Sequence, residues 1–348
     1  MINLLIVDDS AVARTFLNYI FSLDPDIRVV GIARSGIEAL ELVKRNKPNV
    51  ISMDIHMPVM DGFETTRKIM ETFPTPIVLV SQSMNITEVS IAYKSIEAGA
   101  LACVARPVSI DHPDFEKGAK ELIQTIKLMS EVKLVRRWAK KEGPTETHTE
   151  AVAKKNDFVI PANHVSLLAI GASTGGPSVI LEILSGISKN IPFPVLITQH
   201  MSPGFEQGFA DWLSHSSGLP VSIAMHEERP VKGHVYLAPT NFNMGVNAKG
   251  QITLSKAKAN QHICPSIDFL FQSVSRVYGG SAVAIILSGM GSDGACGMKL
   301  LYDKGAVTIA QDEKSCVVYG MPKEAINAQA VKYVLPPTEI SEFINSII

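Results

Sequence analysis

The sequence predicts two α/β domains, each built on a doubly wound sheet whose strands are mostly parallel. Short apolar runs alternate with helical segments in the first part of the chain, stop at a polar segment, and then resume. Such alternation is typical of a parallel sheet covered by helices on both faces. The length of 348 residues also exceeds what one core usually holds. We therefore expect domains at residues 1–137 and 164–348, joined by a linker at 138–163.

The first domain is expected to contain five strands separated by helices. Two of the intervening segments, Ala11–Phe21 and Ile37–Arg45, repeat apolar residues at helical spacing. The runs that we expect to form strands are Leu4–Val7, Val29–Ala33, Val50–Met53, Ile77–Val80 and Ala102–Ala105.

The segment 138–163 is rich in Lys, Glu, Thr, Ala and Pro and has almost no apolar periodicity. We expect it to be a mobile linker. In the second domain, apolar runs at Val165–Ile170, Val195–Thr198 and Ala282–Leu287 are expected to be buried parallel strands.

The middle of the second domain departs from strict alternation. Short strands are expected at Val221–Ala224, His234–Leu237 and Gln251–Leu254, with turns such as Lys249-Gly250 between them. Closely spaced short strands with glycine turns are typical of hairpins. We therefore expect an antiparallel hairpin at one edge of the second sheet.

The composition excludes several classes of protein. Hydrophobic residues make up 46% and charged residues 19%, which is typical of a globular chain. The net charge of −2 gives no electrostatic reason to bind nucleic acid or an anionic membrane. No apolar stretch is long enough to span a bilayer, and the N-terminus lacks a basic leader. The four scattered cysteines fit a reducing compartment, so we expect a cytoplasmic protein.

Acidic residues follow two of the predicted strands in the first domain. Asp8 and Asp9 end the first strand, and Asp54 ends the third. Their three carboxylates would share one crevice, and a hard cation such as Mg²⁺ would relieve the repulsion between them. Ser81 and Arg106 end the fourth and fifth strands, where a hydroxyl and a cation would contact a phosphoryl group on Asp54. The alternative is that the acids are separate capping or loop residues.

Three loops of the second domain carry a serine, a histidine and an aspartate. Ser173 lies in Gly171-Ala172-Ser173-Thr174-Gly175, which fits the G-x-S-x-G pattern between a strand and a helix. His200 follows the next predicted strand, and Asp293 lies in a glycine-rich loop after a third. Delivered to one sheet edge, these side chains would act as nucleophile, general base and orienting carboxylate.

Each of these residues also has an alternative role. A glycine-rich turn between strand and helix is used by dinucleotide sites, but here the spacing is not G-x-G-x-x-G. Ser173 would otherwise cap a helix, His200 would be structural, and Asp293 would cap the helix through Met298–Leu301. The chain order Ser, His, Asp differs from that of α/β-hydrolases and of the two best-known protease groups.

The first domain resembles the receiver domain of response regulators. The segment Asp54-Ile55-His56-Met57-Pro58-Val59-Met60-Asp61-Gly62 is similar to the loop that follows the phosphorylated aspartate in that family. The resemblance implies a flavodoxin-like fold, phosphorylation of Asp54 and Mg²⁺ bound by Asp8, Asp9 and Asp54. Arg106 stands where the family usually has Lys; Arg keeps the charge but has a different shape. Attraction would draw Arg106 into the crevice, whereas its larger head would favour pointing outward.

The second domain resembles the catalytic domain of CheB-type protein-glutamate methylesterases. The resemblance implies a Rossmann-like α/β domain, catalysis by Ser173, His200 and Asp293, an oxyanion site at Met290, and a positioning role for Thr174. Besides the three loops, similar segments are Gln199–Phe205, Gly233–Pro239, Pro265–Asp268, Ala310–Glu313 and Gly320–Ala325.

The resemblance also implies an activity and its partners. The expected reaction is hydrolysis of glutamate γ-methyl esters on chemotaxis receptors, with deamidation of some receptor glutamines and no cofactor for the esterase. The expected phosphodonor is a chemotaxis sensor histidine kinase, and phosphorylation would relieve inhibition by the receiver. Two other classes stay open: a nucleotide-binding regulator and a catalytically silent adaptor.

Overall fold

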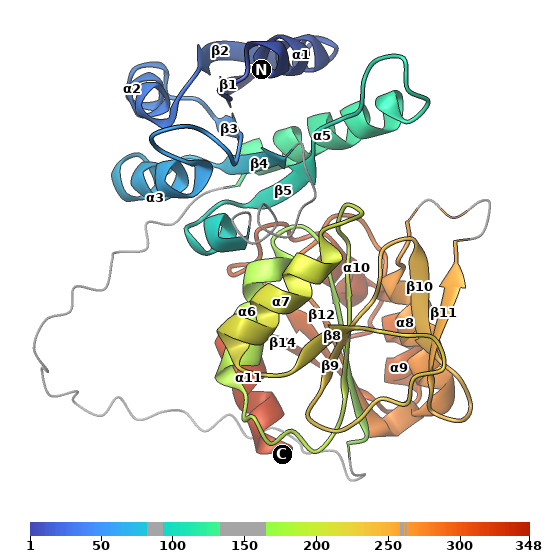
Figure 1. The fold of residues 1–348 in the computed structure, drawn as a ribbon. Helices are drawn as coiled ribbons and strands as arrows, with labels where there is room; N and C mark the ends of the chain where they lie inside the picture. Colours follow the sequence, from blue (N-terminus) through green and yellow to red (C-terminus); the bar gives the residue numbers. More distant parts are fainter. Residues whose placement is uncertain (82–92, 133–164, 258–260, 262) are drawn as a thin grey trace, which may run out of the picture.

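The computed structural model describes residues 1–81, 93–132, 165–257, 261 and 263–348. Two separate parallel sheets, one in each half of the chain, form the two units seen one above the other in Figure 1. The predicted linker at 138–163 lies outside the described residues. The α/β fold class predicted from the alternation of strands and helices is confirmed for both halves.

The N-terminal sheet has five parallel strands in the order β2-β1-β3-β4-β5. All five predicted strands are present, although β1 and β2 each begin two residues earlier than the apolar runs. The strands are β1 Ile2–Val7, β2 Ile27–Ala33, β3 Val50–Met53, β4 Ile77–Ser81 and β5 Ala102–Ala105. Helices α1 Ala11–Ser22, α2 Gly36–Asn46, α3 Gly62–Thr72 and α5 Phe115–Ser130 pack around them.

The C-terminal sheet has seven parallel strands in the order β14-β13-β12-β6-β7-β9-β8. Its strands are β6 Leu167–Ala172, β7 Val195–Gln199, β8 Val221–Ile223, β9 Val235–Leu237, β12 Ala282–Ile286, β13 Val307–Gln311 and β14 Tyr333–Leu335. Its helices are α6 Gly176–Gly186, α7 Glu206–Ser217, α8 Ile267–Val277, α9 Ala295–Asp303, α10 Met321–Asn327 and α11 Pro337–Ser346.

The short strands in the middle of this half are arranged differently from the expectation. β8 and β9 are parallel members of the main sheet, with β9 paired to β7 and β8 at the edge. The antiparallel hairpin joins β10 (Phe242–Val246) to β11 (Ile252–Lys256) in a two-stranded sheet of its own. Three-residue strands carry no direction in their pattern, so the sequence could not show that β8 and β9 run parallel.

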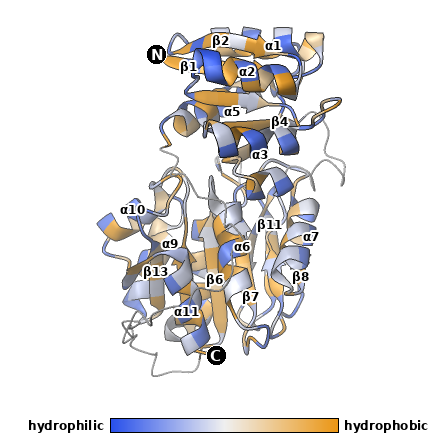
Figure 2. Ribbon diagram, turned by 90° about the vertical axis from the view of Figure 1, so that its left-hand side faces the viewer, coloured by the Kyte–Doolittle hydropathy of each residue, from blue (hydrophilic) through white to orange (hydrophobic). Residues whose placement is uncertain are grey.

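Alternating side chains of each sheet pack against helices on its two faces. In the C-terminal unit, Leu168 and Ile170 face α6, α7 and α11, whereas Leu167 and Ala169 face α8, α9 and α10. The same alternation holds in the N-terminal unit, where one face of β1 packs on α2 and α3 and the other on α1 and α5. Figure 2 shows the resulting apolar interior of both units. Burial of both faces explains why the central strands read as continuous apolar runs.

The two units contact each other through aromatic side chains. The Tyr93 ring, which is buried, lies 5.0 Å from the rings of both Phe209 and Trp212 of α7. The indole N–H of Trp212 donates to a Glu97 carboxylate oxygen at 2.7 Å, and the Ser216 hydroxyl donates to the same oxygen at 3.3 Å. On the C-terminal side, Val317 and Val318 pack against a core cluster of the N-terminal unit. The N-terminal unit therefore rests on α7 and on the loop before α10.

A close approach between α8 and α9 depends on glycine. Gly294 precedes α9 at φ +98°, and a Cβ atom there would lie 2.7 Å from Cγ2 of Ile267 in α8. Gly305 has a similar φ of +78°, but a Cβ atom there would meet nothing within 4 Å. The two positions therefore separate the cost of the backbone conformation from the cost of crowding.

We expect Gly294→Ala to destabilise the chain much more than Gly305→Ala. A side chain at positive φ costs about 1 kcal/mol at either position, and overpacking adds about 1–3 kcal/mol at Gly294 alone. Urea unfolding of both variants measures the difference. Equal losses of stability would mean that α8 and α9 separate easily and that crowding plays no part.

Candidate active site

Three loops meet at the carboxyl edge of the C-terminal sheet. They follow β6, β7 and β12, which are neighbours at the centre of the sheet. From β6 the chain continues to β7 on one side, while β12 lies on the other side, so the strand order reverses at β6. In open α/β sheets the crevice at such a reversal is where ligands bind. The loops carry Ser173, His200 and Asp293, which therefore come to one place as predicted from their positions after strands.

His200 and Asp293 are joined by a hydrogen bond. The distance between His200 Nε2 and Asp293 Oδ2 is 2.9 Å, and both side chains are largely buried. Burial acts to raise the pKa of Asp293, but the hydrogen bond from His200 and N–H groups of the main chain outweigh it and lower the pKa. The carboxylate is therefore ionised at neutral pH and favours the His200 tautomer with its proton on Nε2. In that tautomer Nδ1 is the proton acceptor.

The first turn of α8 holds the Asp293 carboxylate. The main-chain N–H groups of Ile267 and Asp268 donate to it at 2.7 and 3.0 Å, and the Ser266 hydroxyl donates at 2.9 Å. Asp268 in turn accepts from the N–H of Gly297 at 2.6 Å in the first turn of α9. Asp293, just before α9, thus has its carboxylate at the amino terminus of α8. Asp268, in the first turn of α8, has its carboxylate at the amino terminus of α9. Such termini stabilise negative charge.

Ser173 lies against the loop that follows β12. Its N–H donates to the carbonyl oxygen of Ser288 at 2.9 Å. A Cβ atom on Gly289 would lie only 2.6 Å from Cβ of Ser173, so the two loops touch at this point. The N–H of His200 donates to the Ala172 carbonyl at 2.9 Å. Within the described residues no hydrogen bond joins the Ser173 hydroxyl to His200, so the contact of nucleophile and base that the triad requires is not formed here.

The other two residues predicted at this edge, Thr174 and Met290, lie in the two loops that meet at Ser173. The main-chain carbonyl of Thr174 accepts from the Ser288 hydroxyl at 2.7 Å, which ties the nucleophile turn to the loop after β12. Met290 lies in that loop with 45% of its surface exposed. The residue that caps α9 is Gly294. The alternative role predicted for Asp293, as the cap of that helix, is therefore wrong.

The acidic cluster of the N-terminal unit is also assembled as predicted. Asp8, Asp9 and Asp54 each offer a carboxylate oxygen within 4.8 Å of the others, a donor set suited to a hard divalent cation. Arg106 points into the crevice, where Nη2 donates to Asp8 at 2.6 Å and to Asp54 at 3.3 Å. Ser81 ends β4 as a buried residue, and its carbonyl accepts from the N–H of Arg106 at 2.7 Å.

Burial makes this cluster sensitive to pH. It raises the pKa of Asp54 to about 7; the charge of Asp8 adds to the rise and Arg106 opposes it. Burial also raises the pKa of Asp8, again against the attraction of Arg106. The guanidinium of Arg106 therefore offsets only part of the cost of holding two carboxylates together.

Several residues around the active site were not predicted from the sequence. Ser266 and Asp268 set the position of Asp293, although both belong to a segment already noted for its resemblance. Gln199 and Gln311 end β7 and β13 and bond to the catalytic loops. A polar residue at the end of an otherwise apolar strand is the signal that could have found the two glutamines.

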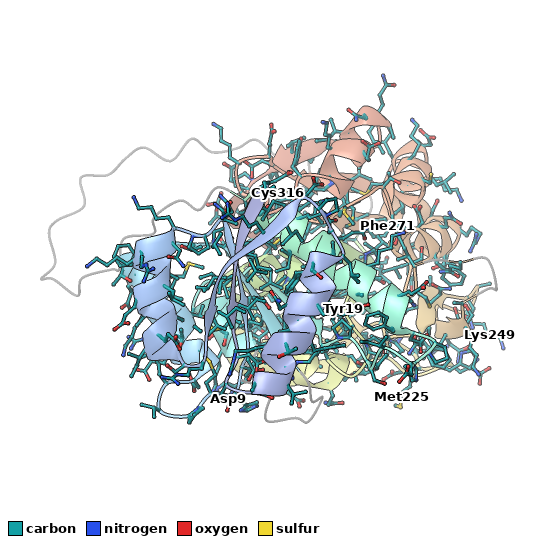
Figure 3. All side chains as sticks on the ribbon, turned by 90° about the horizontal axis from the view of Figure 1, so that it is seen from above. Asp9, Tyr19, Met225, Lys249, Phe271 and Cys316 are labelled. Carbon is teal, nitrogen blue, oxygen red and sulfur yellow. The ribbon has the colours of Figure 1, made fainter. Side chains whose placement is uncertain are left out.

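An apolar hollow of about 590 Å³ lies elsewhere, on the outer side of α1. Figure 3 labels Asp9 beside the start of α1 and Tyr19 farther along the helix. Among the described residues its lining contains no carboxylate, histidine or cysteine. Its lining residues are Ala11, Val12, Thr15, Phe16, Tyr19 and Ile110.

Comparison with known proteins decides the family. The family model described as CheB methylesterase matches residues 168–344, and the one described as response regulator receiver domain matches residues 4–114. This chain belongs to the CheB methylesterase family. The N-terminal unit is a receiver domain, and the predicted resemblance is confirmed for both halves.

Relatives match over nearly the whole chain. The protein-glutamate methylesterase/protein-glutamine glutaminase 1 of Syntrophus aciditrophicus is 48% identical over 341 residues, 98% of this chain and 97% of that protein. The protein-glutamate methylesterase/protein-glutamine glutaminase of Nitrosospira multiformis is 48% identical over 348 residues, which cover 100% of this chain and 97% of that protein. The solved catalytic domain of Thermotoga maritima CheB methylesterase is 35% identical, with a TM-score of 0.51, over 53% of this chain and 100% of that one.

Membership in the methylesterase family bears on the alternatives left open by the sequence. It favours a methylesterase over the nucleotide-binding regulator and the catalytically silent adaptor. Among the described residues no helix has the length and apolar character needed to cross a membrane. The receiver and its acidic cluster make phosphorylation the form of regulation.

We expect Asp54→Asn to stabilise the chain at pH 8 without divalent cations, because the buried charge is removed. The pKa of Asp54 is raised, so the cost of its charge begins above the usual value of 3.8 and is complete above about 7. The gain should be on the order of 2–4 kcal/mol at pH 8 and nearly absent at pH 4. Thermal unfolding at both pH values measures it, with exposed Asp111→Asn as control. A gain that does not depend on pH would contradict the raised pKa.

Proposed function

We propose that the chain is a cytoplasmic enzyme that hydrolyses glutamate γ-methyl esters on chemotaxis receptors and deamidates certain receptor glutamines. The single observation that carries the proposal is the pairing of His200 with Asp293 beside Ser173, at the edge where the catalytic loops meet. The names of the relatives give the substrate class. Esters and amides are cleaved by the same acyl transfer, so one site serves both reactions.

In the proposed reaction Ser173 attacks the carbonyl carbon of the side-chain ester. His200 takes the hydroxyl proton on Nδ1, because Nε2 is already bonded to Asp293. The ionised Asp293 then stabilises the imidazolium, which returns the proton to methanol as it leaves. Water, activated by the same histidine, hydrolyses the acyl-enzyme and restores Ser173. For a glutamine substrate the leaving group is ammonia.

The developing oxyanion needs hydrogen-bond donors near Ser173. We assign this role to the main-chain N–H of Met290, in the loop whose Gly289 touches Ser173. One such donor contributes about 3 kcal/mol to stabilising the transition state. Thr174 follows Ser173 and is assigned to positioning of the substrate or of His200.

The receiver is proposed to accept a phosphoryl group on Asp54 from a chemotaxis sensor histidine kinase. Asp8, Asp9 and Asp54 would hold Mg²⁺, which when bound neutralises charge on the phosphoryl oxygens. Arg106 already points into the crevice and would exchange its bonds with Asp8 and Asp54 for bonds to the phosphoryl group. Ser81 would donate its hydroxyl to the same group.

The contact between the two units supports inhibition by the unphosphorylated receiver. Val317 packs on the receiver side, and a Cβ atom on Gly175 would lie 2.5 Å from Cβ of Val317. The receiver is thus separated from the nucleophile turn by a single side chain. A protein substrate approaching Ser173 would meet the receiver first. Methanol release from methylated receptor membranes, with and without a small phosphodonor, tests activity and regulation together.

We expect Ser173→Ala to abolish both methanol release and receptor deamidation, because no other nucleophile is assigned to this edge. Ser255→Ala, at an exposed serine of β11 away from this edge, should retain activity, and circular dichroism should be unchanged for both variants. A rate with Ser173→Ala near that of the wild type would exclude Ser173 as the nucleophile.

We expect a fragment that begins near Asn163 to release methanol from receptors faster than the unphosphorylated whole chain. Removing the receiver exposes the edge that carries Ser173, whereas the catalytic residues stay the same. The rates are compared at equal concentration on the same receptor membranes, with Ser173→Ala in the fragment as control. A fragment no faster than the whole chain would rule out simple occlusion.

A further inference from the structure

The side chain of Gln199 joins the loops of the proposed nucleophile and base. Gln199 is the last residue of β7 and is 2% exposed. Its Nε2 donates to the carbonyl oxygen of Ser173 at 2.9 Å and to that of His200 at 2.8 Å. Both protons of one amide are therefore used to tie together the main chains of the two residues.

The other end of the Gln199 amide has no such partner. Among the described residues Oε1 accepts no hydrogen bond although it is buried. An unpaired buried acceptor destabilises the folded chain. The two hydrogen bonds of Nε2 offset this cost and hold the side chain in this orientation. Gln311 at the end of β13 is equally buried but uses both ends of its amide, accepting from the Ser288 N–H and donating to the Ser315 hydroxyl. Of these two buried glutamines at strand ends, Gln199 is therefore the one whose amide oxygen is left without a partner.

Gly176 makes room for this arrangement. A Cβ atom at Gly176 would lie 2.4 Å from Gln199 Oε1, whereas Gly175 before it is required by its φ of +78°. Glycine is thus needed at the two positions after Thr174 for different reasons. The first serves the turn that presents Ser173, and the second admits the amide of Gln199.

We propose that Gln199 is a positioning residue that fixes the distance between the Ser173 and His200 loops. The inference rests on the proposed function of these two residues. The main chains of the two loops also meet directly where the His200 N–H donates to the Ala172 carbonyl at 2.9 Å, one residue before Ser173. Among the described residues, the amide of Gln199 is the side chain that bonds to the main chain of both Ser173 and His200. A misplacement of about 1 Å between reacting groups lowers a rate by about 100-fold. Gln199 touches neither substrate nor reacting atoms in this role.

The test replaces Gln199 by Met and by Glu in the full-length chain. Met keeps the length of the side chain and removes both bonds, whereas Glu keeps the shape and cannot donate when ionised. Each variant is assayed for methanol release from methylated receptor membranes and for the rate at which a fluorophosphonate probe labels Ser173. Gln251→Met is the matched control, because Gln251 also donates Nε2 to a main-chain carbonyl, that of Glu227 at 3.0 Å, away from the active site.

The proposal expects Gln199→Met to lower kcat by about 100-fold with KM changed less than twofold. Labelling of Ser173 should slow by a similar factor, and Gln251→Met should leave both rates unchanged. Gln199→Glu should lose activity further as pH rises and its carboxyl group ionises. Rates within twofold of wild type for folded Gln199→Met would overturn the proposal, as would failure of both variants to fold, which would make Gln199 structural only.

The two readouts separate this inference from the proposed function. If the wild type releases no methanol but its Ser173 is labelled at a rate that depends on Gln199, the substrate is wrong and the positioning role stands. If methanol is released and neither rate depends on Gln199, the function stands and the positioning role is wrong.

Discussion

The contact between the Asp293 carboxylate and the amino-terminal turn of α8 is the constraint around which the catalytic edge is arranged. A buried carboxylate is costly unless donors surround it, and here two main-chain N–H groups, one hydroxyl and one imidazole do so. Because α8 also packs on α9 through Gly294, the same contact sets the loop after β12 and the ring of His200. The imidazole is thereby held by a helix that is itself buried against the sheet.

The two acidic sites of the chain treat charge in opposite ways. Asp293 has its pKa lowered because donors outweigh burial, so it stays ionised at neutral pH. Asp54 has its pKa raised to about 7 because burial and the neighbouring Asp8 outweigh Arg106. The first carboxylate is fixed in one state, and the second is close to changing state. That difference suits the roles proposed for them, in which Asp293 stays charged throughout the reaction and Asp54 is modified and then restored.

The fold class and the positions of Ser173, His200, Asp293 and Asp54 just after strands could be predicted from the sequence, because each follows from periodicity and position along the chain. The direction of Arg106 could not be predicted, since attraction to Asp8 and the size of the guanidinium act against each other. The parallel pairing of β8 with β9 was missed because three residues carry too little pattern. The contact of Glu97 with Trp212 joins residues 115 apart in sequence, and no local pattern reports it.

The aromatic character of the contact between the units has a thermodynamic consequence. Tyr93, Phe209 and Trp212 are each less than a tenth exposed, so separating the receiver from α7 would expose apolar surface of this contact to water. Exposure of apolar surface increases the heat capacity. The hydrophobic stabilisation of such a contact therefore weakens as the temperature falls. Packing of the receiver on α7 is thus weaker at low temperature. The equilibrium between the packed and the separated receiver therefore depends on temperature even without a phosphoryl group.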